Sequence, residues 1–420
     1  MEAGLGAVLE RLNAAGEVAH EEDIGEYAVL RHLRQGDEPH AAPVYDYKMI
    51  DDDFMLPIVA ARYLLETPEG RERGAAFLAR RTASGETYGS ALVRNFGYVL
   101  KAAAPFAEDP QWRNLVALKP GETAGNWRDS DEGLGGGRVP YDVNGVFVPA
   151  ALAAIERFHD SGILERHLPP ERDVDISGAG RMAGIWQRRA PRHFDVILPA
   201  SSARDEVAGY AARIGIRPTR ALEQLGEEPV TFHAIALDEA GVPVPILNTD
   251  EAFALLFLDL EPERAARIAA TLSRRFPAGL MTDVGPLAAN PAYADDEHEA
   301  AFDRSRYHGT VIWSWQQAMF AAGIARQLER ADLTPAARAV LARARESLES
   351  AIAGSHAIRG SELWSWSEED GRYSVAPFGQ RTGDVTESNA AQLWSTVYLA
   401  PLSGADGRAR DALRPKPMRP

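Results

Sequence analysis

Apolar residues recur every three or four positions along most of the chain, which is the spacing of helices that bury one face. Thr334 and Pro335 are typical of a helix start, because threonine caps the first turn and proline lacks only an N–H that would have no helical partner there. The pattern predicts about eleven helical segments. Their apolar stripes begin at Phe54, Leu92, Val148, Val207, Ala265, Ile312, Val340 and Ala390.

Only one stretch has a convincing β pattern. Residues 230–237 form an apolar strand that turns through residues 238–241 into 242–246, whose prolines restrict that arm to a sheet edge. We therefore expect a β-hairpin insertion at about 229–246 in an all-α chain. No linker rich in Gly, Ser or Pro divides the helices, so residues 1–403 are predicted to form one domain. Residues 404–420 support no apolar stripe and are predicted to be a flexible tail.

The composition excludes several classes of protein. Lys and Arg number 45 against 61 Asp and Glu, and the net charge of -16 opposes binding to nucleic acid or to anionic membranes. No run of about 18 apolar residues predicts a membrane span. The absence of cysteine excludes disulfides, thiolate metal sites and a cysteine nucleophile. A neutral small molecule or oligosaccharide is the expected partner, and the oligomeric state is left open.

No export signal is visible at the N-terminus, which lacks a basic segment followed by a long apolar one. The chain is therefore expected to be soluble and either cytoplasmic or, if an N-terminal segment was removed, periplasmic or secreted.

One glycine-rich loop concentrates reactive side chains. Trp127, Arg128 and Asp129 stand together, with Asp131 and Glu132 next and four glycines between positions 133 and 137. A pyranose has an apolar face edged by hydroxyls, so it needs an aromatic plane beside carboxylates and a cation. A carboxyl group beside that plane can also protonate a glycosidic oxygen. The loop is therefore the first candidate for a sugar site.

Other acidic clusters have competing interpretations. Residues 51–53 are three aspartates at a predicted helix start, where they either cap the helix or bind a ligand. Residues 20–22, His-Glu-Glu, lack the spacing of metal ligands, and neither a metal nor any other cofactor is expected. Residues 368–371 resemble a solvated turn.

The order of these motifs resembles that of six-hairpin, or (α/α)6-barrel, glycoside hydrolases, and is closest to the glucosidase domain of glycogen-debranching enzymes. Residues 47–54 resemble the family's aromatic-to-Asp motif, and residues 126–130 resemble its Trp-x-Asp segment. Residues 307–315 and 391–395 resemble its aromatic-His-Gly-Thr-Val-Trp stretch and its final helix. The resemblance spans roughly residues 15–400 and implies an (α/α)6 toroid of helical hairpins.

The resemblance also implies single-step inversion of a neutral, α-linked gluco-oligosaccharide or glucoside. Asp129 matches the position of the general acid. The general base has no exact counterpart, and its candidates are Glu387 and Glu362, of which Glu387 is favoured because it lies nearer the last predicted helix. Acid and base should lie roughly 6.5 to 9.5 Å apart to leave room for water. The expected substrate-binding residues are Asp51, Asp53, Trp127, Arg128, Tyr307, His308, Trp313 and Trp364.

Three alternatives stay open on the sequence. A phosphorylase on the same barrel would use inorganic phosphate in place of water and would need no base. An isomerase or epimerase would need paired histidines, and His308 has only His20 as a candidate partner. A non-catalytic carbohydrate-binding protein would fit the uncertain base.

Overall fold

A computed structural model describes residues 1–169, 175–358 and 360–379. Fourteen α-helices lie in this described part, with only short strands, so the fold is mostly helical. The chain divides into two compact units. Unit 1 comprises Met1–Phe194 and Ala236–Val242, and unit 2 comprises Asp195–Ile235 and the chain from Pro243 onwards. The single domain over residues 1–403 stays a prediction, and the predicted tail at 404–420 lies outside the described residues.

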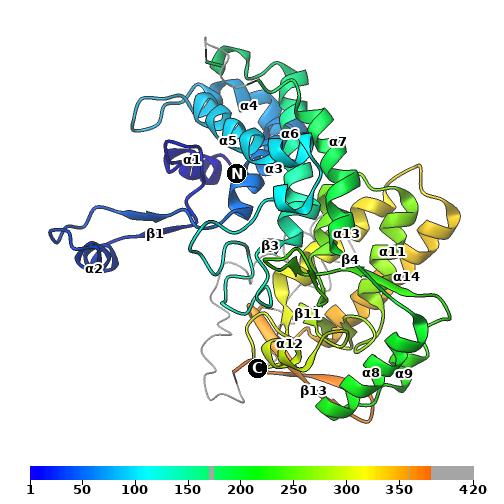
Figure 1. The fold of residues 1–420 in the computed structure, drawn as a ribbon. Helices are drawn as coiled ribbons and strands as arrows, with labels where there is room; N and C mark the ends of the chain where they lie inside the picture. The colour runs from blue at the N-terminus through cyan, green and yellow to red at the C-terminus, as the bar shows by residue number, and fades with distance from the viewer. Residues whose placement is uncertain (170–174, 359, 380–420) are drawn as a thin grey trace, which may run out of the picture. The chain divides into compact units, whose positions relative to one another are not determined.

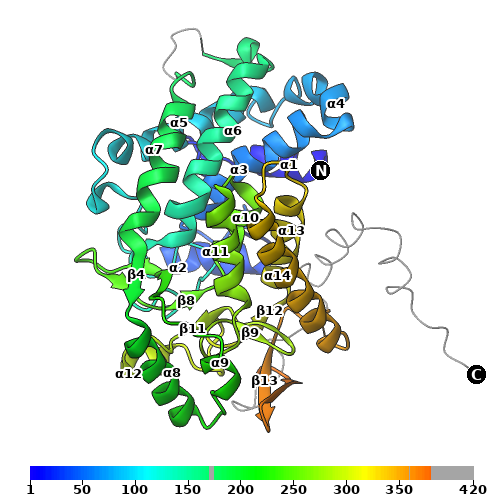
Figure 2. The same cartoon turned by 90° about the vertical axis from the view of Figure 1, so that its right-hand side faces the viewer.

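Unit 1 is built around packed helices, of which the apolar stripes predicted α3, α5 and α6 but not α7. In both views α5, α6 and α7 lie side by side, and α3 packs against α5 and α6 (Figures 1 and 2). Its helices are α1 (Glu2–Glu10), α2 (Glu26–Gln35), α3 (Asp51–Ala61), α4 (Pro68–Leu78), α5 (Tyr88–Glu108), α6 (Val148–Ser161) and α7 (Ala179–Arg189), with the π-helical segments η1 (Arg62–Glu66) and η3 (Asp142–Phe147). Its strands are β1 (Glu21–Asp23), β2 (Val44–Asp46), β3 (Val139–Pro140) and β6 (Ala236–Leu237).

Aromatic contacts join the helices of unit 1. Phe96 on α5 meets Phe158 on α6 with ring centroids 5.3 Å apart, and both side chains are fully buried. Phe106 on α5 meets Trp186 on α7 at 4.5 Å, and the indole N–H donates to a backbone carbonyl of α5. These residues occupy the buried face of each helix, so the helical period of the sequence corresponds to the core.

Unit 2 contains four helices that pack pairwise, α10 with α13, α11 with α14 and α13 with α14 (Figure 2). Its helices are α8 (Ala200–Ile214), α9 (Thr219–Leu222), α10 (Glu251–Phe257), α11 (Pro262–Ser273), α12 (Asp296–Ala301), α13 (Ser314–Leu328) and α14 (Pro335–Gly354). Its strands are β4 (Asp195–Leu198), β5 (Val230–His233), β7 (Pro243–Val244), β8 (Leu247–Asn248), β9 (Met281–Thr282), β10 (Gly285–Pro286), β11 (Ala289–Asn290), β12 (Ile312–Trp313), β13 (Leu363–Glu369) and β14 (Arg372–Ala376).

The turn of the predicted hairpin at 238–241 is confirmed, because the amide of Asp238 donates to the carbonyl of Val242 at 2.9 Å, but the long first strand is not. Instead of one strand over 230–237, β5 ends at His233, and it pairs antiparallel with β4, from Asp195 opposite His233 to Leu198 opposite Val230. The partner strand has only four residues and precedes β5 by more than thirty positions, so no local pattern could reveal the pairing. The predicted turn at 368–371 is confirmed, because it joins β13 to β14 with Asp370 and Gly371 at positive φ.

Gly16 lies in the turn after α1, where the backbone of α5 approaches it closely. Its φ is +96°, and a Cβ added there would lie 2.5 Å from the carbonyl oxygen of Arg94. The Asn95 side chain donates to the carbonyl of Gly16 at 2.9 Å and to that of Asp53 at 3.1 Å, joining the turn to α3. Only glycine fits this conformation and this close backbone approach.

We therefore expect Gly16→Ala to lower the free energy of unfolding by about 2–3 kcal/mol, since both the positive φ and the clash cost energy. Gly36→Ala is the matched control. Gly36 also has positive φ, +85°, but nothing lies within 4 Å of an added Cβ, so its loss should be about 1 kcal/mol. Urea unfolding of the two variants measures the difference, and equal losses would contradict the close approach.

Candidate functional site

The loop that carries Trp127, Arg128 and Asp129 is held by backbone hydrogen bonds within unit 1. The amide of Ile50, just before α3, donates to the carbonyl of Gly125 at 2.6 Å. Further along, the amide of Leu118 donates to the carbonyl of Arg138 at 2.8 Å, which closes the base of the loop. The three predicted residues are therefore mounted on a fixed segment that starts beside α3.

Trp127 and Arg128 form a stacked pair. The guanidinium carbon of Arg128 lies 4.2 Å from the centre of the Trp127 ring, within the range of a cation–π interaction. Arg128 is fully buried, whereas Trp127 is half-buried. Arg128 therefore covers one face of the indole. The sequence predicted both residues, but not that the arginine orders the tryptophan.

Asp129 lies next to this pair. More than a third of the residue is exposed to solvent, yet the protein packed around its carboxyl group raises its pKa, and the positive charges of His20 and Lys48 oppose that rise. His20 is held by Asp52, whose Oδ2 lies 2.8 Å from the imidazole Nδ1, and this hydrogen bond raises the pKa of His20. Neither His20 nor Lys48 was among the predicted site residues.

The three consecutive aspartates at the start of α3 have three different environments. Asp52 is the residue that bonds His20, as described above. Asp51 is buried, and its pKa is raised well above its usual value by burial first and then by the negative charges of Asp52 and Asp142. Asp142, at the start of η3, is fully buried and accepts two hydrogen bonds of 3.0 Å from the Asn126 side chain.

Asp51, before the Trp127 loop in the chain, and Asp142, after it, thus form a pair of interacting buried carboxyl groups. Carboxyl groups that share a site raise each other's tendency to hold a proton. Asp142 was missed by sequence reasoning, although its position five residues beyond the glycine-rich stretch, followed by Asn144, was a polar signal in an apolar run.

Asp53, the third aspartate, lies inside the core of unit 1. One carboxylate oxygen accepts from the amide of Val18 at 2.7 Å, and the other lies 3.4 Å from the Lys119 ammonium group. Lys119 also pairs with Glu17 at 2.7 Å. Burial raises the pKa of Asp53 to about 7, and Lys119 opposes the rise. Because Asp53 is fully buried, the structure places this predicted substrate-binding residue among structural contacts.

In unit 2, four sequence-predicted residues come together. The Tyr307 hydroxyl donates to Oε1 of Glu362 at 3.0 Å, and the Trp313 indole N–H donates to the carbonyl of Tyr307 at 2.9 Å. The His308 ring stacks on the Trp313 ring, with centroids 5.4 Å apart and an interplanar angle of 2°. The strand pairing that places Trp313 opposite Leu363 positions this cluster.

Trp364 does not join that cluster. It follows the cluster's Glu362 by two positions, but its side chain is fully buried and its indole N–H donates to the carbonyl of Val284 at 3.0 Å. Trp364 therefore packs in the core of unit 2. Glu387, the favoured base, lies outside the described residues. Of the two described acid and base candidates, Asp129 belongs to unit 1 and Glu362 to unit 2.

A further polar cluster in unit 2 joins β4, β5 and α10. His233 Nδ1 is hydrogen-bonded to Glu251, and His233 Nε2 lies 3.4 Å from Asp195 Oδ1. The β4–β5 pairing aligns Asp195 with His233, so residues nearly forty positions apart meet. Sequence reasoning had no means of finding this contact. Among the described residues, no group of three or more histidine and acidic side chains is arranged to hold a metal ion.

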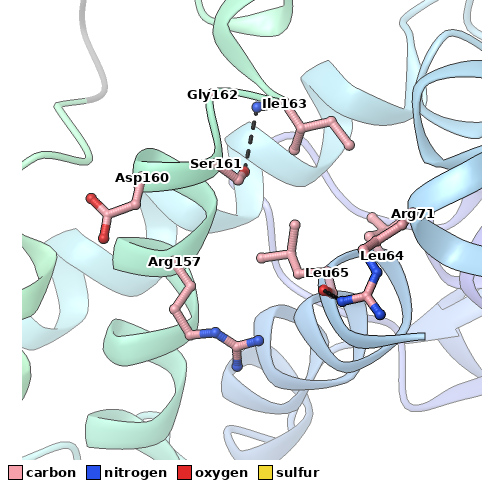
Figure 3. A pocket seen from close by; sticks show the side chains of 8 residues that line it. All are labelled: Leu64, Leu65, Arg71, Arg157, Asp160, Ser161, Gly162 and Ile163. Atoms are coloured by element: carbon pink, nitrogen blue, oxygen red, sulfur yellow. Dashed lines mark hydrogen bonds between the residues drawn. The ribbon is translucent and has the colours of Figure 1, made fainter. Parts of the chain in front are cut away.

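One pocket of unit 1 lies between η1, α4 and α6, and none of the predicted site residues lines it (Figure 3). Its volume is about 550 Å³. Arg157 pairs with Glu66 at 2.8 Å, and Arg71 donates to the carbonyl of Leu65 at 3.1 Å. Each of the two guanidinium groups thus has a partner within unit 1. It is lined by Leu64, Leu65, Arg71, Arg157, Asp160, Ser161, Gly162 and Ile163.

No protein-family profile matches this sequence, and a search of curated proteins finds no match. In the described part of the chain, no helix is long and apolar enough to cross a membrane.

Proposed function

We propose that this protein is a glycoside hydrolase, acting on a neutral, α-linked gluco-oligosaccharide or glucoside by single-step inversion. Asp129 donates a proton to the leaving oxygen, and either Glu387 or Glu362 activates water. The proposal includes an (α/α)6 toroid as the scaffold. One observation carries it: Asp129, with a raised pKa, stands on a fixed loop beside an indole that Arg128 holds in place.

The raised pKa supports the role of Asp129 as a general acid. A proton donor must keep its proton near the working pH, and an ordinary aspartate with a pKa near 3.8 does not. Burial of the Asp129 carboxyl group shifts its pKa in the required direction, while its partial exposure leaves it open to a substrate. Asp131 and Glu132, the next acidic residues of the loop, are exposed.

The indole of Trp127, which the Arg128 side chain covers on one face, and the neighbouring carboxyl group of Asp129 support a sugar as the ligand. An indole face matches the apolar face of a pyranose, and carboxyl groups accept hydrogen bonds from its hydroxyls. In unit 2, Tyr307 holds one oxygen of Glu362, which supports Glu362 as the alternative base because a base must be oriented toward its water.

The test is hydrolysis of α-linked glucosides and gluco-oligosaccharides by the full chain, with the anomer of the first product followed by NMR. An inverting enzyme releases the β-anomer from an α-linked substrate. Glu387→Gln and Glu362→Gln are compared. We expect the substitution at the true base to lower kcat by about 10²- to 10⁴-fold, and the substitution at the other glutamate to leave most activity. The control, Glu369→Gln in the exposed β13–β14 turn, should also leave most activity.

Other outcomes would replace the proposal. Cleavage that requires inorganic phosphate would identify a phosphorylase. Binding of oligosaccharides without turnover by the unsubstituted protein would identify a carbohydrate-binding protein. Release of the α-anomer first would exclude inversion.

A further inference from the structure

An exposed apolar face lies on α2 and on Ile24, two residues before the helix, in a part of unit 1 that the proposed site does not use. Ile24, Tyr27, Leu30 and Leu33 have exposed fractions of 60%, 76%, 49% and 50%. They make up four of the seven large apolar residues that are exposed among the described residues. The last three are spaced three residues apart, so they lie on one face of the helix.

The helix belongs to a segment, residues 21–46, that we call the arm. In it β1 precedes α2 and β2 follows it, and the two strands pair antiparallel from Glu21 opposite Asp46 to Asp23 opposite Val44. Figure 1 shows α2 and β1 reaching away from α1 and α5. Ala28 is the one buried residue of α2. The helix thus buries almost none of its apolar surface within its own unit.

The size of this face fits a second copy of the chain. With roughly 200 Å² for a large side chain, the four exposed fractions amount to on the order of 500 Å² per copy. A patch of that size is at the upper end of what a monomer exposes. Two such faces in contact would bury on the order of 1,000 Å² of apolar surface, which is the lower limit for a specific interface.

We propose that two copies of this chain associate by packing the α2 face, defined as Ile24, Tyr27, Leu30 and Leu33, against the same face of the other copy. The contact is isologous, with one patch meeting itself about a two-fold axis, which is the commonest arrangement of soluble oligomers. Each arm carries its own apolar face to the contact. The interface is at the small end of the specific range, so dissociation is expected in the micromolar range.

Sedimentation equilibrium of the full chain tests the proposal. We expect twice the monomer mass at high micromolar concentration, and a shift to monomer for Leu30→Glu, since a charge at the centre of the face would be buried without a partner. Val242→Glu is the matched control, because Val242 is equally exposed, at 56%, and lies in unit 1 outside the arm. Circular dichroism checks that both variants are folded.

The absence of cysteine from the chain allows a second, independent measurement. Leu30→Cys should form a disulfide-linked dimer under mild oxidation, because Leu30 lies near the middle of α2, where the two copies meet. Val242→Cys should not. A monomeric unsubstituted protein at high micromolar concentration, or equal cross-linking of both cysteine variants, would overturn the proposal. Flotation with anionic vesicles that is lost in Leu30→Glu would assign the face to a membrane instead.

Discussion

Asp129→Asn is expected to lower kcat/KM for an alkyl or oligosaccharide α-glucoside by about 10²- to 10⁴-fold, the contribution of a positioned general acid. The amide has nearly the shape of the carboxyl group but cannot donate the proton that the leaving oxygen needs. The measurement is kcat/KM across glucosides with graded leaving groups. Substrates with acidic aryl leaving groups need little protonation, so they should lose much less.

Asp131→Asn is the control for this experiment. It makes the same change in the same loop, at an exposed side chain that accepts a hydrogen bond from Thr123 at 2.9 Å. Its kcat/KM should stay close to that of the unsubstituted protein. If Asp129→Asn hydrolyses normally, or loses equally on all leaving groups, Asp129 is not the proton donor.

The largest expected effect on stability concerns Asp53. Its folded-state pKa of about 7 lies above its usual value of 3.8, so in the window between these values the folded chain holds a proton that the unfolded chain has lost. The free energy of unfolding therefore falls as pH rises through this window. A shift of this size corresponds to about 4 kcal/mol, present in full below the lower value and lost above the upper one.

Asp53→Asn removes this titration. Its urea unfolding midpoint should therefore depend less on pH within the window than that of the unsubstituted protein, and the difference between the two should change sign or shrink as pH rises. Asp131→Asn, at an exposed carboxylate, should follow the unsubstituted curve. Parallel curves for the protein and for Asp53→Asn would show that Asp53 ionises at the same pH in both states.

The helices were predictable because their signals are local. The N-cap at Thr334 is confirmed, since its side chain accepts from the amide of Ala337 at 3.2 Å, and Pro335 opens α14 as expected. The stripe on α5 is also confirmed, with Leu92, Phe96 and Val99 buried. Helix periodicity and caps depend on residues within one or two turns, so they can be found in a single sequence.

The candidate site was predictable in composition but not in arrangement. The sequence located Trp127 and Asp129 because several unusual side chains share one loop. It could not show that Asp53 turns into the core, or that His20 lies near the Asp129 carboxyl group. Neighbouring residues in a helix point in different directions, and which one meets the core depends on the elements packed against that helix.

The sequence by itself determined the mostly helical fold, the helix start at Thr334 and the concentration of polar and aromatic side chains at 125–132 and 307–315. Only the tertiary structure decided that β5 pairs with β4, that Asp51 shares its surroundings with Asp142, and that Trp364 packs in the core. The difference is physical. Period, capping and composition act between near neighbours, whereas strand pairing, burial and carboxyl coupling arise between residues that the chain brings together only when it folds.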